Sequence, residues 1–195
     1  MKGVVLCGGQ SLRMGHDKGL LVSGKEKNVW ARIMKKKFSQ ISVSTVLSIN
    51  SMQNENYLRH FDEKDLVVDS PTINIEGPLL GLLSVHIKYP DQDLMVVGCD
   101  MINMDGVVLM KLFSSHTASK TEAISFKGER IEPLCAVYTS IGLAKIYTAY
   151  RKKKLHRNSM MHVLEKLNTA YISIPDEWKI FFKNFNSAED LITAN

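Results

Sequence analysis

Glycines and cations are concentrated in the segment that follows the short apolar run Gly3–Cys7. The segment reads GGQSLRMGHDK, and it carries three glycines together with Arg13 and Lys18. A chain that only reverses direction needs one Gly or Asn. Backbone N–H groups approach phosphate oxygens closely where no Cβ intervenes, and two cations can neutralise the charge of a triphosphate. The segment therefore predicts a loop that binds a phosphorylated ligand.

This loop matches neither of the two common phosphate-binding fingerprints. The dinucleotide pattern G-x-G-x-x-G is not met, because Gly8 and Gly9 are adjacent and the next glycine is Gly15. The P-loop pattern G-x-x-x-x-G-K-[ST] is not met either, because five residues separate Gly9 from Gly15 and Lys18 follows after two more. A dehydrogenase is thereby disfavoured, and a longer glycine-rich loop between a strand and a helix is indicated.

The elements that must position this loop alternate between β-type and helical patterns. The expected strands are Gly3–Cys7, Ile41–Ile49, Leu66–Val68, Leu94–Cys99, Ala123–Phe126, Leu134–Tyr138 and Tyr171–Ile174. The expected helices include Val29–Phe38, Leu79–Tyr89, Val107–Phe113 and Ile141–Tyr150. Alternation of this kind predicts an α/β fold with a mostly parallel sheet, and nearly continuous apolar strands predict helices on both faces. The segment Glu129–Pro133 interrupts the alternation and is a candidate start for an antiparallel excursion.

Glycine or polar residues follow four of the expected strands at the point where each strand ends. They are Gly8 with Gly9, Asn50, Asp69 and Asp100. Open parallel sheets bind ligands at the carboxyl ends of their strands, so these residues are expected to share one site. Mg²⁺ takes one or two carboxylates and completes its shell with phosphate oxygens and water, which makes Asp100 a candidate metal ligand.

Each of these residues also has a purely structural interpretation. Asp100 could cap a helix or begin a turn, and the VVDSP segment around Asp69 is ordinary turn chemistry. Lys18 could be an exposed lysine at the start of a helix, and Arg13 could brace the loop. Cys7 is interpreted as a small strand residue, because the sequence offers it no histidine partner. Residue types alone leave these alternatives open.

The bulk composition is that of an ordinary globular domain. The chain has 195 residues, of which 45% are hydrophobic and 23% charged, and we expect residues 1–195 to form a single domain. No apolar run approaches the roughly 20 residues of a membrane span, and the N-terminus does not resemble a signal peptide, so we expect a cytoplasmic protein that binds no membrane. The three cysteines lack paired spacing, which predicts reduced thiols.

The net charge of +5 is concentrated in two basic clusters, Lys35–Lys37 and Arg151–Arg157. We interpret both as solvated helix ends, where cations complement the helix dipole. Nucleic acid is disfavoured as a partner because aromatic residues are not interleaved with these cations. Trp30 and Trp178 are expected to pack in the core.

The opening loop resembles that of a known family. LCGGQSLRMGHDKGLL is similar to the L-x-G-G-x-S-x-R-M-G-x-D-K loop of the molybdenum cofactor guanylyltransferase family, within the nucleotidyltransferase superfamily. Further matches occur in family order at Asn50 and in the segments VVDSPTINIEGPLLGLLS, VVGCDM, EPLCAVY and NFNSAEDL. The resemblance runs from Leu6 to Leu191 and is weakest between Thr139 and Lys183. It implies a Rossmann-like three-layer nucleotidyltransferase domain.

The resemblance also implies roles for individual residues. The nucleotide-binding positions that it implies are Leu6, Cys7, Gly8, Gly9, Lys18, Asn50, Asp69, Gly77, Pro78, Gly81 and Asp100. Catalysis is assigned to Lys18, Arg13 and Asp100, with Asp100 as the Mg²⁺ ligand. The late motif carries Asn184 and Asn186 as candidate active-site residues. The chain departs from the family pattern at Cys7, where Ala is usual, and at Gly98, where Pro is usual.

The activity implied by the resemblance is Mg²⁺-dependent transfer of GMP from GTP to the phosphate of molybdopterin, with or without molybdenum, and release of pyrophosphate. Proteins that deliver or accept the cofactor would be its partners. The Gly8–Gly9 pair and the RMGHDK segment favour guanylyl transfer. Three alternatives remain: a cytidylyltransferase acting on molybdopterin, a nucleotidyltransferase acting on a sugar phosphate, and a non-catalytic nucleotide-binding module.

Overall fold

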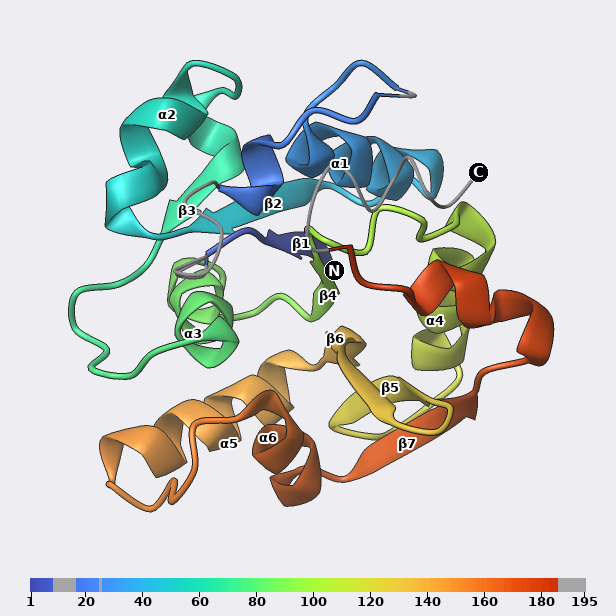
Figure 1. The fold of residues 1–195 in the computed structure, drawn as a ribbon. Helices are drawn as coiled ribbons and strands as arrows, with labels where there is room; N and C mark the ends of the chain where they lie inside the picture. Colours follow the sequence, from blue (N-terminus) through green and yellow to red (C-terminus); the bar gives the residue numbers. More distant parts are fainter. Residues whose placement is uncertain (9–16, 25, 186–195) are drawn as a thin grey trace.

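The computed structural model describes residues 1–8, 17–24 and 26–185. Within them a seven-stranded sheet has the order β3-β2-β1-β4-β6-β5-β7 (Figure 1). The strands are β1 (Lys2–Leu6), β2 (Thr45–Ile49), β3 (Leu66–Val68), β4 (Leu94–Gly98), β5 (Ala123–Lys127), β6 (Ile131–Tyr138) and β7 (Thr169–Ser173). Strand β6 is antiparallel to β4 and β5, and the other pairings are parallel. The predicted mostly parallel sheet is confirmed.

Helices cover both faces of this sheet. The α-helices are α1 (Trp30–Gln40), α2 (Asn54–Leu58), α3 (Pro78–Lys88), α4 (Gly106–Thr117), α5 (Ser140–Arg151) and α6 (Met160–Lys166). The 3-10 turns are η1 (Lys18–Leu20), η2 (Ser51–Gln53), η3 (Glu63–Asp65) and η4 (Asp176–Phe182). One hydrophobic layer lies under α1, α4 and η4, and the other under α3, α5 and α6. Neighbouring residues of a strand enter opposite layers, as Val4 and Val5 do, which explains the continuous apolar runs.

The element boundaries differ from expectation mainly at β2. The run Ile41–Ile49 was expected to be one strand, but β2 begins only at Thr45. The preceding residues close the end of α1: Ser42 has a φ of 58°, and the Val43 N–H donates to the Phe38 carbonyl. The antiparallel excursion was placed correctly, because β6 begins within Glu129–Pro133. The short helices α2 and α6 were not expected.

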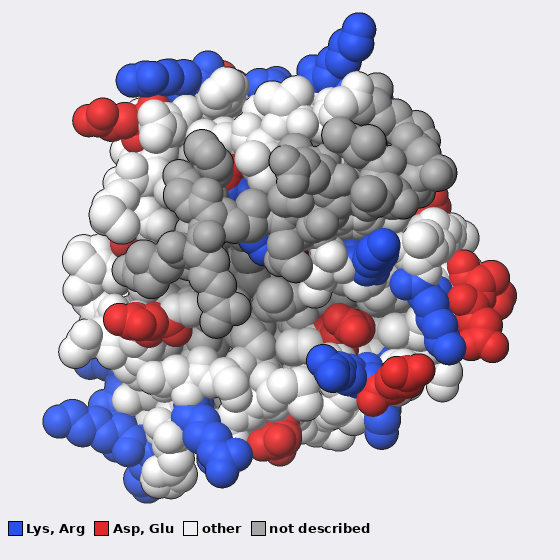
Figure 2. Space-filling model, viewed as in Figure 1, with Lys and Arg blue, Asp and Glu red and all other residues white. Residues whose placement is uncertain are grey.

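The two basic clusters behave differently. Lys35 pairs with Asp65, and Lys37 donates to the Ile102 carbonyl, where burial lowers the pKa of its ammonium group. The interpretation of Lys35–Lys37 as a solvated helix end was therefore wrong for two of its three residues. Residues 151–154 are exposed, as expected. Figure 2 shows Lys and Arg side chains gathered at the lower left, where Figure 1 has the end of α5.

Two smaller expectations concern the tryptophans and the cysteines. Trp30 is fully buried, and the Trp178 ring packs edge-on against Phe126, as expected for core residues. The cysteines are buried free thiols, as predicted. In the part of the chain that the structure describes, no helix combines the length and the apolar character that crossing a bilayer requires.

Candidate functional site

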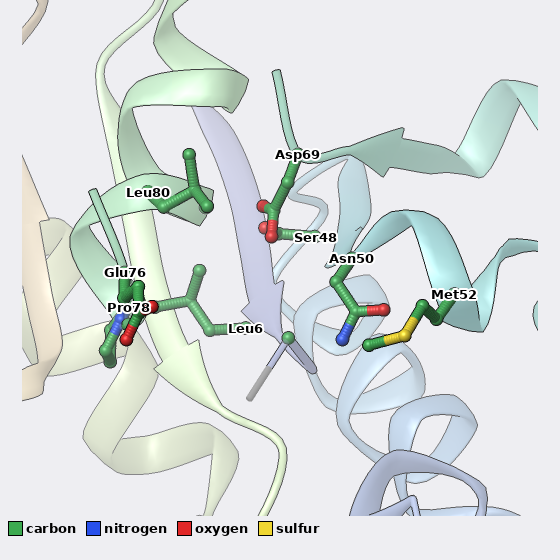
Figure 3. A pocket seen from close by; sticks show the side chains of 11 residues that line it. Leu6, Ser48, Asn50, Met52, Asp69, Glu76, Pro78 and Leu80 are labelled. Atoms are coloured by element: carbon green, nitrogen blue, oxygen red, sulfur yellow. The ribbon is translucent and has the colours of Figure 1, made fainter. Parts of the chain in front are cut away.

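A cavity of about 360 Å³ opens at the carboxyl ends of β1, β2 and β3, beside the start of α3 (Figure 3). Its lining residues are Leu6, Gly8, Ser48, Asn50, Met52, Asp69, Glu76, Gly77, Pro78, Leu80 and Gly81. Seven of these were predicted from the sequence: Leu6, Gly8, Asn50, Asp69, Gly77, Pro78 and Gly81. Sequence reasoning missed Ser48, Met52, Glu76 and Leu80. The signal for Ser48 was a single hydroxyl in the otherwise apolar end of β2.

Two buried polar atoms in this cavity have no hydrogen-bond partner among the described residues. They are Oδ1 of Asp69 and Oγ of Ser48. Both lie around Gly81, where an added Cβ would stand 2.4 Å from Ser48 Oγ and 3.6 Å from Asp69 Oδ1. The missing side chain at Gly81 therefore keeps room beside them. An unpaired buried polar atom is costly, so these atoms are suited to hydrogen-bond a ligand.

Burial also alters the acidity of Asp69. The surrounding protein desolvates its carboxylate and raises its pKa to about 6. The backbone holds this residue firmly, because its N–H donates to the Ile49 carbonyl at 2.8 Å and so continues the pairing of β3 with β2. The backbone thus fixes the position of Asp69 at the edge of the cavity, and burial favours the protonated form of its carboxyl group.

The rim of the cavity is formed by turns with specific backbone requirements. Gly77 has a φ of +81°, a conformation that favours glycine, and Pro78 occupies the first position of α3, where its missing N–H costs nothing. The start of an α-helix carries a partial positive charge, and the Glu76 carboxylate lies in the same rim. Asn50 accepts a hydrogen bond from the Gln53 N–H and caps η2, which leaves its NH₂ group toward the cavity.

Lys18 and Asp100 lie on adjoining parts of the same sheet edge. The Lys18 Nζ is 3.4 Å from Asp100 Oδ2, and the two side chains are 22% and 23% exposed. Asp100 follows β4, the strand next to β1, so the pair stands beside the strand end that carries Gly8. A Cβ at Gly98 would stand 2.8 Å from Asp100 Oδ1, so glycine at this position accommodates the observed carboxylate orientation.

The donor set at Asp100 is compatible with Mg²⁺. The described residues contain no cluster of three or more His, Cys, Asp or Glu side chains that could enclose a metal ion. Mg²⁺ bound with a nucleotide needs no such cluster, because one or two carboxylates suffice when phosphate oxygens and water supply the other ligands. The partly exposed Asp100 carboxylate fits this arrangement.

Two of the five remaining predicted site residues, Cys7 and Asn184, lie in the part of the chain that the structure describes, and they do not line the cavity. The Cys7 side chain is buried in the core, and its thiol donates to the Val5 carbonyl. Asn184 is exposed, and the N–H of the next residue, Phe185, donates to the Asp100 carbonyl at 3.1 Å. This bond brings the late motif close to Asp100. Gly9, Arg13 and Asn186 lie outside the described residues.

Comparison with known families identifies the fold. The description "MobA-like NTP transferase domain" belongs to a family model that matches residues 3–169, most of the chain. The chain belongs to this family. The predicted resemblance is thereby confirmed, and the protein is a nucleotidyltransferase with a three-layer α/β fold.

Individual relatives of this MobA-like chain cover nearly its whole length. A "Probable molybdenum cofactor guanylyltransferase" of Peptoclostridium acidaminophilum is 26% identical over 96% of this chain and 85% of its own. One of the same description from Flavobacterium johnsoniae is 25% identical, covering 98% and 94%. The crystal structure of "Molybdopterin-guanine dinucleotide biosynthesis protein A" from Archaeoglobus fulgidus has the same fold, with a TM-score of 0.80, 23% identity and coverage of 100% and 96%.

Proposed function

We propose that this protein transfers GMP from GTP to the terminal phosphate of molybdopterin and releases pyrophosphate. The observation that carries the proposal is the cavity with unpaired Asp69 and Ser48 atoms, beside the Lys18–Asp100 pair. The cavity around Asp69 and Ser48 suits a nucleobase, and the Lys18–Asp100 pair suits phosphates and a metal ion. The descriptions of the two curated relatives support the choice of GTP and of molybdopterin.

Guanine is the base that an ionised Asp69 fits best. The guanine N1–H and 2-amino groups are two adjacent donors, and a carboxylate accepts both. Cytosine instead presents the N3 lone pair beside its amino group, so one carboxylate oxygen would face another acceptor. Leu6 and Leu80 line the same cavity and offer apolar surface to a flat base. This favours guanylyl over cytidylyl transfer.

The phosphate end of the proposed reaction involves Lys18 and Asp100. An oxygen of the acceptor phosphate attacks the α-phosphorus of GTP, and the bond from that phosphorus to pyrophosphate breaks. Lys18 would neutralise charge on the phosphates, and Asp100 would hold Mg²⁺ with them. Mg²⁺ supplies further charge neutralisation at the phosphate oxygens. The reaction needs no protein nucleophile, consistent with the buried side chain of Cys7.

The proposed function extends to the acceptor, the partners, the cellular location and the domain organisation. We propose that the acceptor is molybdopterin or its molybdenum-bound form, that proteins exchanging this cofactor are partners, and that the protein acts in the cytoplasm. We also propose that residues 1–195 form one domain. Phe182 in η4 packs against Phe126 of β5 with ring centroids 5.0 Å apart, which favours a single domain.

A thermal-stability scan with GTP, CTP, ATP and UTP, each with Mg²⁺, tests the nucleotide. A ligand that binds only the folded state raises stability by RT ln(1 + [L]/Kd), so at about 100 times Kd the gain is roughly 2.7 kcal/mol. We expect GTP to raise Tm by several degrees and the other nucleotides to raise it much less. An equal or larger rise in Tm with CTP would indicate a cytidylyltransferase instead. Release of pyrophosphate in the presence of molybdopterin then measures turnover.

Substitution of the loop cations tests the phosphate assignment. We expect Lys18→Ala to reduce turnover more than Arg13→Ala, because Lys18 lies beside Asp100 and would follow the charge of the transferring group. Pyrophosphate release at saturating GTP measures the difference. If both variants change only the thermal stability of the protein, the loop is structural and does not bind the reacting phosphates.

A further inference from the structure

The residue before Lys18 is held by three hydrogen bonds from two other segments and its own turn. Asp17 Oδ1 accepts from the Gly19 N–H at 3.0 Å and from the Tyr57 hydroxyl at 3.1 Å. Its Oδ2 accepts from Gln53 Nε2 at 2.6 Å. Gln53 ends η2 and Tyr57 lies in α2, so this carboxylate connects the Lys18 turn to the chain that follows β2.

The Tyr57 hydroxyl reaches Asp17 through space that the missing side chain of Gly19 leaves open. Tyr57 is fully buried, and a Cβ at Gly19 would stand 2.1 Å from the hydroxyl oxygen. Glycine at position 19 therefore leaves the space that the hydroxyl occupies. Burial raises the pKa of Tyr57 well above its ordinary value, so the hydroxyl remains protonated and donates to the carboxylate.

Gln53 connects the same carboxylate to the rim of the nucleotide cavity. Its Nε2 also donates to the Cys7 carbonyl at 3.1 Å, and its Oε1 accepts from the Asn50 N–H at 2.8 Å. Cys7 follows β1 and Asn50 follows β2, so one side chain ties two strand ends to Asp17. The turn that carries Lys18 is thus fixed relative to the cavity.

We propose that Tyr57 and Gln53 are positioning residues, which act through Asp17 to hold Lys18 toward the reacting phosphates. This inference rests on the proposed function, because it gives Lys18 its role on the phosphates. Neither side chain needs to touch the nucleotide for this effect. Small displacements of a charged group in an active site cost much of its effect on rate, up to about 100-fold for roughly 1 Å. Loss of one of three bonds to Asp17 should have a smaller but measurable effect.

The test compares Tyr57→Phe with Tyr138→Phe. Both tyrosines are fully buried, and each hydroxyl donates to an oxygen acceptor, the Asp17 carboxylate for Tyr57 and the Pro133 carbonyl for Tyr138 at 2.8 Å. Tyr138 pairs with Leu94 at the start of β4, at the opposite end of that strand from Asp100. Each substitution therefore removes one buried hydroxyl, one inside the proposed positioning network and one away from the site.

We expect Tyr57→Phe to lower kcat about 10-fold while KM for GTP changes less than about threefold, because the base contacts are kept. In thermal-shift titrations with Mg²⁺, its affinity for tripolyphosphate should fall and its affinity for guanosine should not. Tyr138→Phe should lower Tm without either effect.

The outcomes separate this inference from the function on which it rests. Equal kcat and tripolyphosphate affinity in Tyr57→Phe and Tyr138→Phe would overturn the positioning role, even if the wild-type enzyme is fully active. Equal loss of guanosine and tripolyphosphate binding would also overturn it, because it would indicate general disruption of the site. A wild-type protein that releases no pyrophosphate from GTP would contradict the proposed function instead, and the tripolyphosphate comparison would still decide the role of Tyr57.

Discussion

Asp100→Asn is expected to reduce nucleotidyl transfer by at least about 100-fold, the effect of removing one group that stabilises charge in a transition state. The substitution keeps the size of the side chain but removes the charge that would bind Mg²⁺ and that pairs with Lys18 at 3.4 Å. Because Asp100 is partly exposed at the sheet edge, the fold should be retained. Pyrophosphate release at saturating GTP and Mg²⁺ measures the rate, and circular dichroism checks the fold.

Asp105→Asn is the matched control for Asp100→Asn. Asp105 is an exposed carboxylate that caps α4 by accepting from the Val107 N–H at 2.8 Å, and Asn is an equally good cap. This variant should retain wild-type activity. Mg²⁺ should add to the GTP-induced rise in Tm for the wild type and for Asp105→Asn, but not for Asp100→Asn. Activity of Asp100→Asn within a few-fold of wild type would remove Asp100 from the mechanism.

The sequence predicted the strand ends of the site well, because the carboxyl ends of parallel strands must meet at one edge. Gly8, Asn50 and Asp69 were placed together by that rule alone, and they line one cavity. The rule does not indicate which way a side chain turns. Cys7 matched a nucleotide-contacting position, yet its side chain enters the core on the other side of the strand from Leu6.

What the sequence could not predict are contacts between segments far apart in the chain. Asp17 meets Gln53 and Tyr57, which are 36 and 40 residues away, and no local pattern indicates such pairs. Ser48 was not predicted, because a strand hydroxyl between two apolar residues usually finds a partner inside the fold. In the fold, Ser48 Oγ instead lies beside the glycine at position 81 of α3 and has no partner among the described residues.

Protonation of Asp69 should weaken the proposed recognition of guanine, so the affinity for GTP should depend on pH. GTP should bind best when the carboxylate is ionised, so its affinity should be highest above about pH 7 and should fall as the pH is lowered through the pKa of about 6. Asp69→Asn should lose this dependence. Titrations of GTP between pH 5 and 8 measure it, and a pH-independent affinity in the wild type would exclude an ionised Asp69 from base recognition.

The stability of the unliganded protein should change in the opposite sense. The pKa of Asp69 is higher in the folded protein than the ordinary value of 3.8, so the ionised carboxylate destabilises the fold. This destabilisation is complete above about pH 6 and is lost as the pH falls toward 4. Asp69→Asn should therefore raise Tm at pH 7.5 while it weakens GTP binding. A loss of both stability and binding would indicate a structural role for Asp69.

Base choice is the most direct consequence of Asp69 facing the cavity. If its carboxylate accepts from both guanine N1–H and the 2-amino group, wild type should bind GTP more tightly than ITP, which lacks the 2-amino donor. A hydrogen bond to a charged group contributes roughly 1.5–3 kcal/mol, or about 10- to 150-fold in affinity. Asp69→Ala should remove that preference, weakening GTP much more than ITP. Competition titrations of GTP, ITP and CTP at fixed Mg²⁺ measure these ratios. Wild type that prefers CTP, or that binds ITP as tightly as GTP, would contradict guanine recognition, because cytosine presents an acceptor beside its amino group and ITP lacks the 2-amino donor.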